Sequence, residues 1–247
     1  MIHEKMAEDL RKLGIRSDDT ILMHSSLSSL GYVEGGAETV IDTLLHVLSD
    51  GTLLVPALSF ATVTAAAPNF SAKDTPSCVG AISEYFRKRH GVMRSLHPTH
   101  SVCGIGKNAA EMLRHHLETD TPVGAGSPFA LLPKYGGKVL MLGCGLSPNT
   151  SMHGVEELSK PWYLLTKAPM TYQLTDTDGK TFSKSYYCHN FHASKAGQRY
   201  KRLADVMEIP SGKVLQATAH LIDAKTMWEV GDGLLRENAN YFIDILE

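Results

Sequence analysis

Lys138-Val-Leu-Met-Leu-Gly-Cys-Gly-Leu-Ser-Pro-Asn-Thr-Ser-Met-His-Gly-Val-Glu-Glu157 passes from an apolar run through a glycine turn into a helical pattern. The run at 138–142 predicts a buried strand, since short apolar segments are typical of strands covered on both faces. Gly143 and Gly145 let the chain turn sharply, and Pro148 suits the first turn of a helix. A strand that leads through such a turn into a helix is typical of α/β proteins, which bind ligands at this edge of the sheet.

The same alternation of strand and helix extends toward the N-terminus. Apolar runs predict strands at 20–24, 52–55 and 100–105, and helical spacing predicts helices at 40–48, 80–89 and 108–116. Helices that connect successive strands place those strands parallel and cover the sheet. We therefore predict an α/β fold with a mostly parallel central sheet flanked by helices.

The C-terminal third has a different pattern. Two strand-like segments at 169–174 and 180–187 flank Asp176-Thr-Asp-Gly179, which predicts an antiparallel hairpin. A basic helix at 195–207, a strand at 214–221 and a terminal helix are expected after it. No linker or repeat interrupts the chain, so residues 1–247 are predicted to form a single α/β domain with an antiparallel C-terminal hairpin extension.

The composition is that of an ordinary soluble protein. With 24 Lys and Arg against 26 Asp and Glu in 247 residues, the formal net charge of -2 argues against a general nucleic-acid-binding protein. The longest apolar runs fall short of the roughly 20 residues of a membrane-spanning helix, and no apolar leader opens the chain. The 4 cysteines form no CxxC pair and are expected to be free thiols. We expect a cytoplasmic protein, monomeric or homodimeric, that binds neither nucleic acid nor membranes.

His153 and Glu156 are the first candidates for chemistry. They are three residues apart on the expected helix after the glycine turn, so their side chains share one face. A carboxylate there can accept a hydrogen bond from one imidazole nitrogen and leave the other nitrogen free as a general base. The alternative is an ordinary pair of polar residues on a solvated helix face.

The serine-rich loop after the first strand is a candidate anion site. Ser25, Ser26 and Leu27 directly follow the expected strand at 20–24. Backbone N–H groups in such a loop can bind a phosphate. No Walker lysine follows, and serine-rich loops between elements are common, so the loop alone does not identify a function.

Two histidine pairs raise the possibility of a metal site. His97 and His100 are three residues apart, and His189 and His192 repeat that spacing. Zinc is the metal to test for such ligands, and the four residues together would suggest a metal-dependent hydrolase. Pro98 interrupts any regular helix between the first two, and most histidines of this kind are hydrogen-bonded structural groups.

Short motifs in a fixed order along the chain carry a family resemblance. They are His24-Ser25-Ser26-Leu27 with Leu30-Gly31 and Gly35-Gly36-Ala37, Asp50-Gly51-Thr52-Leu53 ending at Pro56, Thr75-Pro76-Ser77 with Gly80-Ala81, Phe86-Arg87, Arg94-Ser95, His97-Pro98, His100-Ser101, Asp120-Thr121-Pro122, Gly126-Ser127-Pro128, Gly136-Gly137-Lys138-Val139-Leu140, and Asn149-Thr150-Ser151 with His153 and Glu156. Any one piece is common, but the ordered set resembles the aminoglycoside 3-N-acetyltransferases over residues 18–165.

The resemblance implies acetyl transfer from the co-substrate acetyl-CoA to an amine of an aminoglycoside or related amino sugar, and hence a role in antibiotic resistance. His153 would be the general base and Glu156 would hold it, with Thr150 donating to the developing oxyanion. The cofactor-binding residues implied are Ser25, Ser26, Leu27, Ser101 and Val102. No metal is expected.

The acceptor side of the expected site departs from what a polycation needs. Residues 61–67, Ala-Thr-Val-Thr-Ala-Ala-Ala, lie where a substrate rim is expected and contain no carboxylate. The substrate-binding candidates that remain are Asp74, Glu84, Glu157 and His189. Besides the metal-dependent hydrolase, a catalytically silent CoA-binding module stays open as an alternative.

Overall fold

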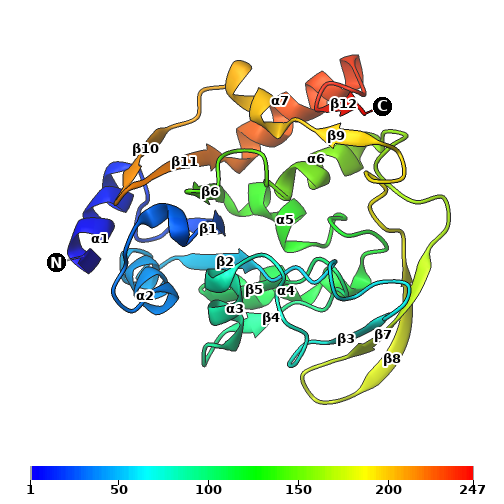
Figure 1. Ribbon diagram of the computed structural model, residues 1–247, viewed down its shortest axis with the longest axis horizontal. Coiled ribbons are helices and arrows are strands. Elements are labelled where there is room, and N and C mark those ends of the chain that lie inside the picture. Colours follow the sequence, from blue (N-terminus) through cyan, green and yellow to red (C-terminus); the bar gives the residue numbers. More distant parts are fainter. Residues whose placement is uncertain (1, 247) are drawn as a thin grey trace.

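The computed structural model describes residues 2–246. A seven-stranded sheet, in the order β10-β11-β6-β1-β2-β5-β4, forms its centre (Figure 1). The strands are β1 (Thr20–Ser25), β2 (Thr52–Pro56), β4 (Met93–Arg94), β5 (Val102–Gly106), β6 (Lys138–Leu142), β10 (Ser211–Val214) and β11 (Ala217–Asp223).

The three middle strands of this sheet are parallel. β1 pairs in parallel with both β2 and β6, while β11, β10, β5 and β4 join by antiparallel pairing on either side. As a result β10, β6, β1, β2 and β4 share one direction, and only β11 and β5 run against it. The predicted α/β fold with a helix-flanked and mostly parallel sheet is confirmed.

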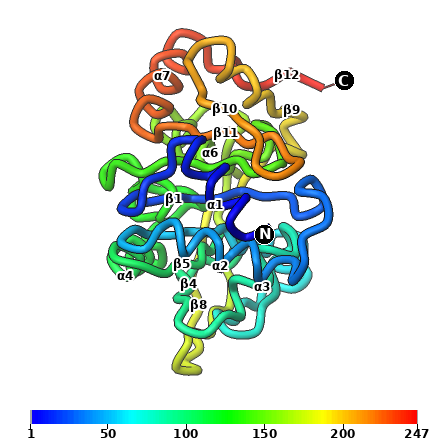
Figure 2. The backbone as a smooth tube through the Cα atoms, turned by 90° about the vertical axis from the view of Figure 1, so that its left-hand side faces the viewer, coloured from blue at the N-terminus to red at the C-terminus, as the bar shows by residue number. Residues whose placement is uncertain are grey.

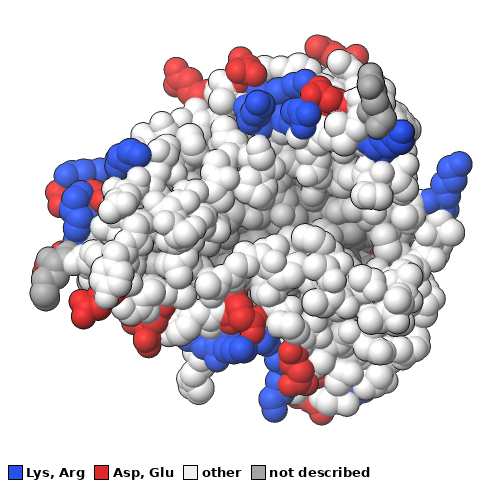
Figure 3. All heavy atoms as spheres, in the orientation of Figure 1, with Lys and Arg blue, Asp and Glu red and all other residues white. Residues whose placement is uncertain are grey.

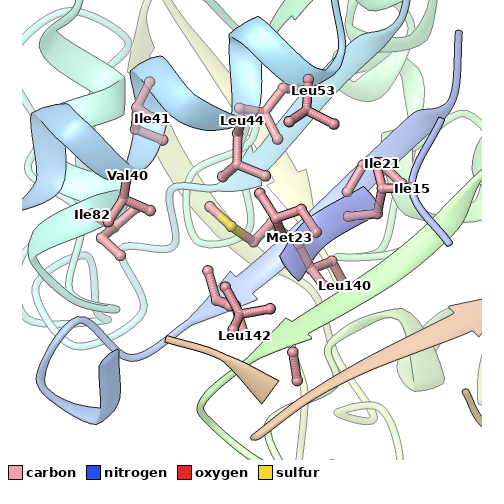
Figure 4. Packing of buried hydrophobic residues seen from close by; sticks show 14 of the residues in the cluster. Ile15, Ile21, Met23, Val40, Ile41, Leu44, Leu53, Ile82, Leu140 and Leu142 are labelled. Carbon is pink, nitrogen blue, oxygen red and sulfur yellow. The ribbon is translucent and has the colours of Figure 1, made fainter. Parts of the chain in front are cut away.

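Alternating side chains of the strands supply two separate cores. Ile21, Met23 and Leu140 point to one face, whereas Leu22 and Val139 point to the other. Both faces are therefore buried, which explains why these strands are continuous apolar runs in the sequence. Figure 4 shows the first core, where side chains of α2 (Ala37–Val47) meet those of the strands.

Helices cover the two faces in two groups. The first core includes residues of α1 (Ile2–Lys12), α2 and α3 (Ala81–Lys88). The second includes residues of α4 (Ala109–Arg114), α5 (Pro128–Leu131), α6 (Ser151–Ser159) and α7 (Ala224–Glu237). Short 3-10 helices, η1 (Ser28–Leu30), η2 (His116–Glu118), η3 (Leu132–Tyr135) and η4 (Tyr200–Asp205), complete the helical elements. Within the described chain, none of the helices combines the length and the apolar character required to cross a lipid bilayer.

The expected hairpin forms a separate small sheet. β7 (Met170–Thr175) and β8 (Thr181–Tyr186) are antiparallel, and β3 (Asn69–Ser71) pairs with β7 in parallel. The end of this hairpin projects below the main body in Figure 2. The hairpin prediction is confirmed, and the parallel partner β3 was not foreseen.

The prediction of a basic helix at 195–207 is wrong. The chain there forms β9 (Ala196–Gln198), which pairs with β12 (Ile243–Ile245), and then the 3-10 helix η4. Lys195 has a φ of 52°, a left-handed conformation that interrupts a right-handed helix at its first residue. Burial of Tyr200 and Leu203 then fixes the 3-10 turn against the second core.

Candidate active site

The carboxyl ends of β1 and β2 open into a cavity of about 590 Å³. Ser25 and Pro56 reach it from these strands, Thr150 and His153 from the start of α6, and Tyr200 from η4. Parallel strands bring their carboxyl ends to one edge of a sheet, which is where α/β proteins bind ligands. The glycine turn after β6 therefore leads to a cavity, as its sequence indicates.

The turn between β6 and α6 depends on Gly143. Its φ of 75° is left-handed, and a Cβ atom there would lie 2.8 Å from the Cβ of Ser29 and 3.1 Å from the Cβ of Ala217. The chain then enters α6, where the Oδ1 of Asn149 accepts a hydrogen bond from the N–H of Ser151 at 3.2 Å. Only glycine can make this close turn, and the turn sets the start of the helix that carries His153.

His153 and Glu156 belong to a buried hydrogen-bond network that includes two tyrosines. The Nδ1 of His153 lies 3.1 Å from the Oε2 of Glu156 and 2.7 Å from the hydroxyl of Tyr200. The Tyr200 hydroxyl donates to the same Oε2 at 2.8 Å, and the Tyr163 hydroxyl donates to Oε1 at 2.8 Å. Glu156 is fully buried, and a small part of His153 is exposed in the cavity.

These contacts select a proton arrangement when Glu156 is ionised. A carboxylate only accepts hydrogen bonds, so both tyrosine hydroxyls and the Nδ1–H of His153 point toward it. Because Tyr200 donates its proton to Glu156, its oxygen is free to accept from that same Nδ1–H. The Nε2 of His153 then carries a lone pair, which is the tautomer a general base requires.

Burial governs the protonation of this pair. Desolvation lowers the pKa of His153 to about 3. Desolvation also raises the pKa of Glu156 to about 8, against the opposing hydrogen bonds from Tyr200 and Tyr163. The two groups are in contact and titrate together. The state with neutral imidazole and ionised carboxylate therefore increases as the pH rises through about 8.

The serine-rich loop lies at the edge of the same cavity. Ser25 lines it, and Leu27 and Ser28 begin the 3-10 helix η1. The N–H of Ser26 donates to the carbonyl of Leu142 at 2.9 Å, so it is not available to a ligand. Over residues 2–246, the N–H of Leu27 has no protein acceptor. Among the predicted N–H donors, Ser26 is thus engaged within the protein, whereas Leu27 is available to a ligand.

Ser101 and Val102 are not brought to the cavity. Both are fully buried, and the Ser101 hydroxyl donates to the carbonyl of Ala57 at 2.8 Å while it accepts from Arg94 at 2.9 Å. The N–H of Val102 donates to the Ser95 hydroxyl at 2.8 Å. Their polar groups are used inside the protein, so this cavity lends no support to the prediction that they line a CoA channel; His100, next to them, does line the cavity.

Of the four substrate-binding candidates, only His189 lines the cavity. Glu157 accepts hydrogen bonds from the hydroxyl of Thr121 and from the N–H of Val123, away from it. Asp74 and Glu84 line a different hollow of about 1000 Å³. The acidic residues expected to receive a cationic substrate are therefore absent from this site.

The imidazole rings of His97, His100 and His189, three of the proposed metal ligands, pack against other histidine rings. His97 lies 4.8 Å from His116, His100 lies 4.7 Å from His189, and His189 lies 4.3 Å from His153, measured between ring centroids. The Nδ1 of His97 accepts from the N–H of His100 at 3.0 Å. Among the residues that the structure describes, no group of three or more His, Cys, Asp or Glu side chains could hold a metal ion. Nothing in this geometry favours the metal-dependent hydrolase.

The sequence patterns did not predict the aromatic side chains of this site. Phe191 lies 4.9 Å from His153 between ring centroids, and Phe60 lies at the cavity rim with about half of its surface exposed. Tyr200 follows His153 by 47 positions. No spacing rule connects positions so far apart, so a sequence pattern could not have assigned them.

Comparison with known proteins identifies the relatives of this chain. Residues 22–236 match the family model described as aminoglycoside 3-N-acetyltransferase. Aminoglycoside N(3)-acetyltransferase VII of Streptomyces paromomycinus is 35% identical over 175 residues, which cover 63% of this chain and 60% of that protein. The match thus spans about three fifths of the relative's length.

Two solved structures extend the likeness to nearly the whole fold. The YokD protein from Bacillus subtilis has a TM-score of 0.80 at 27% identity, covering 96% of this chain and 99% of YokD. A structure described as AAC-VIa bound to sisomicin has a TM-score of 0.80 at 25% identity, covering 95% and 97% of the two chains. The family match, which includes the glycine turn and α6, leads to one conclusion: the chain belongs to the aminoglycoside 3-N-acetyltransferase family.

Proposed function

We propose that this protein transfers an acetyl group from acetyl-CoA to a primary amine, with His153 as general base. The observation that carries the proposal is the network in which Glu156 and Tyr200 hold the Nδ1 of His153 beside the cavity. Membership of an acetyltransferase family supports the reaction type. The similar fold of AAC-VIa, which is bound to sisomicin in its structure, supports an amine acceptor.

The reaction proceeds by direct attack. The amine nitrogen forms a bond to the thioester carbonyl carbon, and the Nε2 of His153 removes a proton from that nitrogen. The carbon–sulfur bond then breaks, and the imidazolium returns its proton to the departing thiolate, which gives free CoA and the N-acetyl amine. Glu156 stabilises the imidazolium during this step.

Thr150 and Leu27 have supporting roles in the proposal. Thr150 lines the cavity one helical turn before His153, so its hydroxyl can donate to the oxyanion that develops on the carbonyl oxygen. The N–H of Leu27, with Ser25 beside it, binds the phosphate end of CoA. Cys144 also lines the cavity, but burial raises the pKa of its thiol to about 11, which favours direct transfer over an acyl-cysteine intermediate.

Free-thiol release from acetyl-CoA in the presence of amines tests the proposal. The purified chain should release thiol only when an amine is present, and His153→Ala should lower kcat by about 10² to 10⁴, the usual contribution of a general base. CoA should still raise the Tm of the His153→Ala protein, since that residue does not bind the phosphates. Equal turnover in the variant would remove His153 as the base, and CoA-induced stabilisation without turnover on any amine would identify a silent binding module instead.

A further inference from the structure

The cavity that holds His153 has uncharged walls. Of the described residues that line it, none is Asp, Glu, Lys or Arg. In Figure 3 the hollow in the middle of the drawn face is bordered by white atoms, and the charged side chains gather toward the edge of that face. A ligand in this cavity would meet apolar, hydroxyl, amide and imidazole groups.

Four of the five histidines that line the cavity do not supply charge either. Burial lowers the pKa of His24 to about 3, and it lowers the pKa values of His100 and His189 well below their usual range. These rings are neutral near pH 7. His153 is neutral for the same reason. These four rings thus supply no charge, and the lining contains no carboxylate that could attract a cation.

The nearest carboxylates are already engaged. Glu156 lies behind His153 and accepts from Tyr163 and Tyr200. Glu157 is held by Thr121 and Val123. Neither carboxylate lines the cavity, so neither is in position to receive a second ammonium group from a ligand there.

We propose that the acceptor is a primary amine that bears a single positive charge on an otherwise uncharged body, and that polycationic amines are poor acceptors. The inference rests on the proposed acetyl transfer. Each further ammonium group of a polyamine would have to leave water without meeting a carboxylate, which is strongly unfavourable. A single ammonium escapes this difficulty, because it must lose its proton before it can attack the thioester, and uncharged walls favour the neutral amine.

The aromatic walls fit such a body. Phe60 at the rim lies 6.3 Å from His100, and Phe191 lies 5.4 Å from His189, between ring centroids. Aromatic faces pack against the apolar faces of sugar rings or alkyl groups, and they also attract one cation as it enters. Neither contact depends on opposite charges.

Matched acceptors with one and four amino groups test the proposal. Glucosamine against neamine, and 2-phenylethylamine against spermine, are compared by thiol release from acetyl-CoA with the intact protein. We expect kcat/KM to be at least about tenfold higher for the monoamine of each pair. We also expect KM for glucosamine to change less than about twofold with added salt, because no ion pair contributes to its binding.

A carboxylate placed at the rim sharpens the test. Phe60→Asp should raise kcat/KM for neamine relative to glucosamine by at least about fivefold, whereas Asp74→Asn, in the other hollow, should leave that ratio within about twofold. A wild-type protein that prefers neamine, with a KM that rises with salt, would overturn the acceptor class and leave acetyl transfer intact. If none of the four amines supports thiol release, and CoA does not raise the Tm, the proposed function itself would instead be rejected.

Discussion

Two hollows of this protein contrast in charge. The hollow of about 1000 Å³ is lined by both acidic and basic side chains, among them Asp74, Glu84, Arg87 and Lys88. There Glu84 pairs with Arg87 at 2.7 Å and with Lys88 at 2.8 Å. The cavity of about 590 Å³ has no charged lining among the described residues, yet a buried His–Glu–Tyr network lies directly behind its wall.

This contrast shows that abundant charge is a poor guide to the proposed active site. Ion pairs with Arg87 hold the pKa of Glu84 at about 2, so this carboxylate stays ionised and inert near pH 7. Glu156, without a cation beside it, has its pKa raised to about 8 by burial. Only the second carboxylate changes its protonation near neutral pH, which is typical of functional groups.

Loss of stability in acid, caused by the histidines in and around the uncharged cavity, should be the strongest of the predicted effects. Six histidines, His24, His97, His100, His116, His153 and His189, have lowered pKa values because of burial. Below about pH 6.5 the unfolded chain binds protons that the folded chain does not, so stability falls as the pH falls. Each histidine lowers the free energy of unfolding by up to about 1.4 kcal/mol for each pH unit of acidification. Glu156 acts in the opposite direction, because its raised pKa lets the folded chain bind one proton that the unfolded chain does not. Urea unfolding at pH 7.5, 6.0 and 5.0 measures this, and equal free energies of unfolding would contradict it.

The next effect concerns Glu156. Its carboxylate must be ionised for the Nε2 of His153 to act as base, so kcat/KM should rise roughly tenfold per pH unit below about pH 8 and level above it. Glu156→Gln should lower kcat about tenfold to a hundredfold and abolish the rise of kcat/KM with pH, which is the acidic limb of the pH profile. The profile is measured with an acceptor whose own amine pKa lies below 6, so that amine ionisation adds nothing. If the Glu156→Gln protein kept the same rise of kcat/KM with pH, that rise would belong to the ionisation of another group.

A smaller effect is expected for Tyr200→Phe. The Tyr200 hydroxyl lowers the pKa of Glu156, so its removal should move the activity limb to higher pH. We expect kcat at pH 7.5 to fall about threefold to tenfold with little change in the KM for acetyl-CoA. An altered KM with an unchanged limb would mean that Tyr200 contacts the substrate instead.

The smallest effect belongs to the charged hollow. Glu84→Gln removes ion pairs that are partly exposed to solvent, which are worth about 1 kcal/mol or less in total. Activity should therefore stay within about twofold of wild type while the Tm falls slightly. A large loss of turnover in this variant would erase the contrast between the two hollows.

Residues close together in the chain were the ones that the sequence predicted well. The strand at 138–142, the turn at Gly143 and the pairing of His153 with Glu156 all depend on spacings of a few residues. Alternating burial on the strands likewise follows from their own side chains. Local geometry determines such features, so a pattern suffices.

Features that depend on distant parts of the chain were not predicted. Tyr200 reaches Glu156 across 44 positions, and β9 exists only because β12 pairs with it. Ser101 follows a motif shared with the family, yet contacts with Ala57 and Arg94 bury it. Tertiary packing decides these positions, and no short motif encodes it.

The antiparallel pairing of β11 with β6 bears on how the protein is made. β6 ends at Leu142, but β11 begins only at Ala217, so during synthesis one edge of β6 stays open until the later segment 200–223 has emerged. Tyr200 lies within that same late segment. A chain released before residue 200 would expose the unpaired edge of β6 and also lack the tyrosine that contacts His153, so protection from aggregation and completion of the buried hydrogen-bond network depend on the same segment.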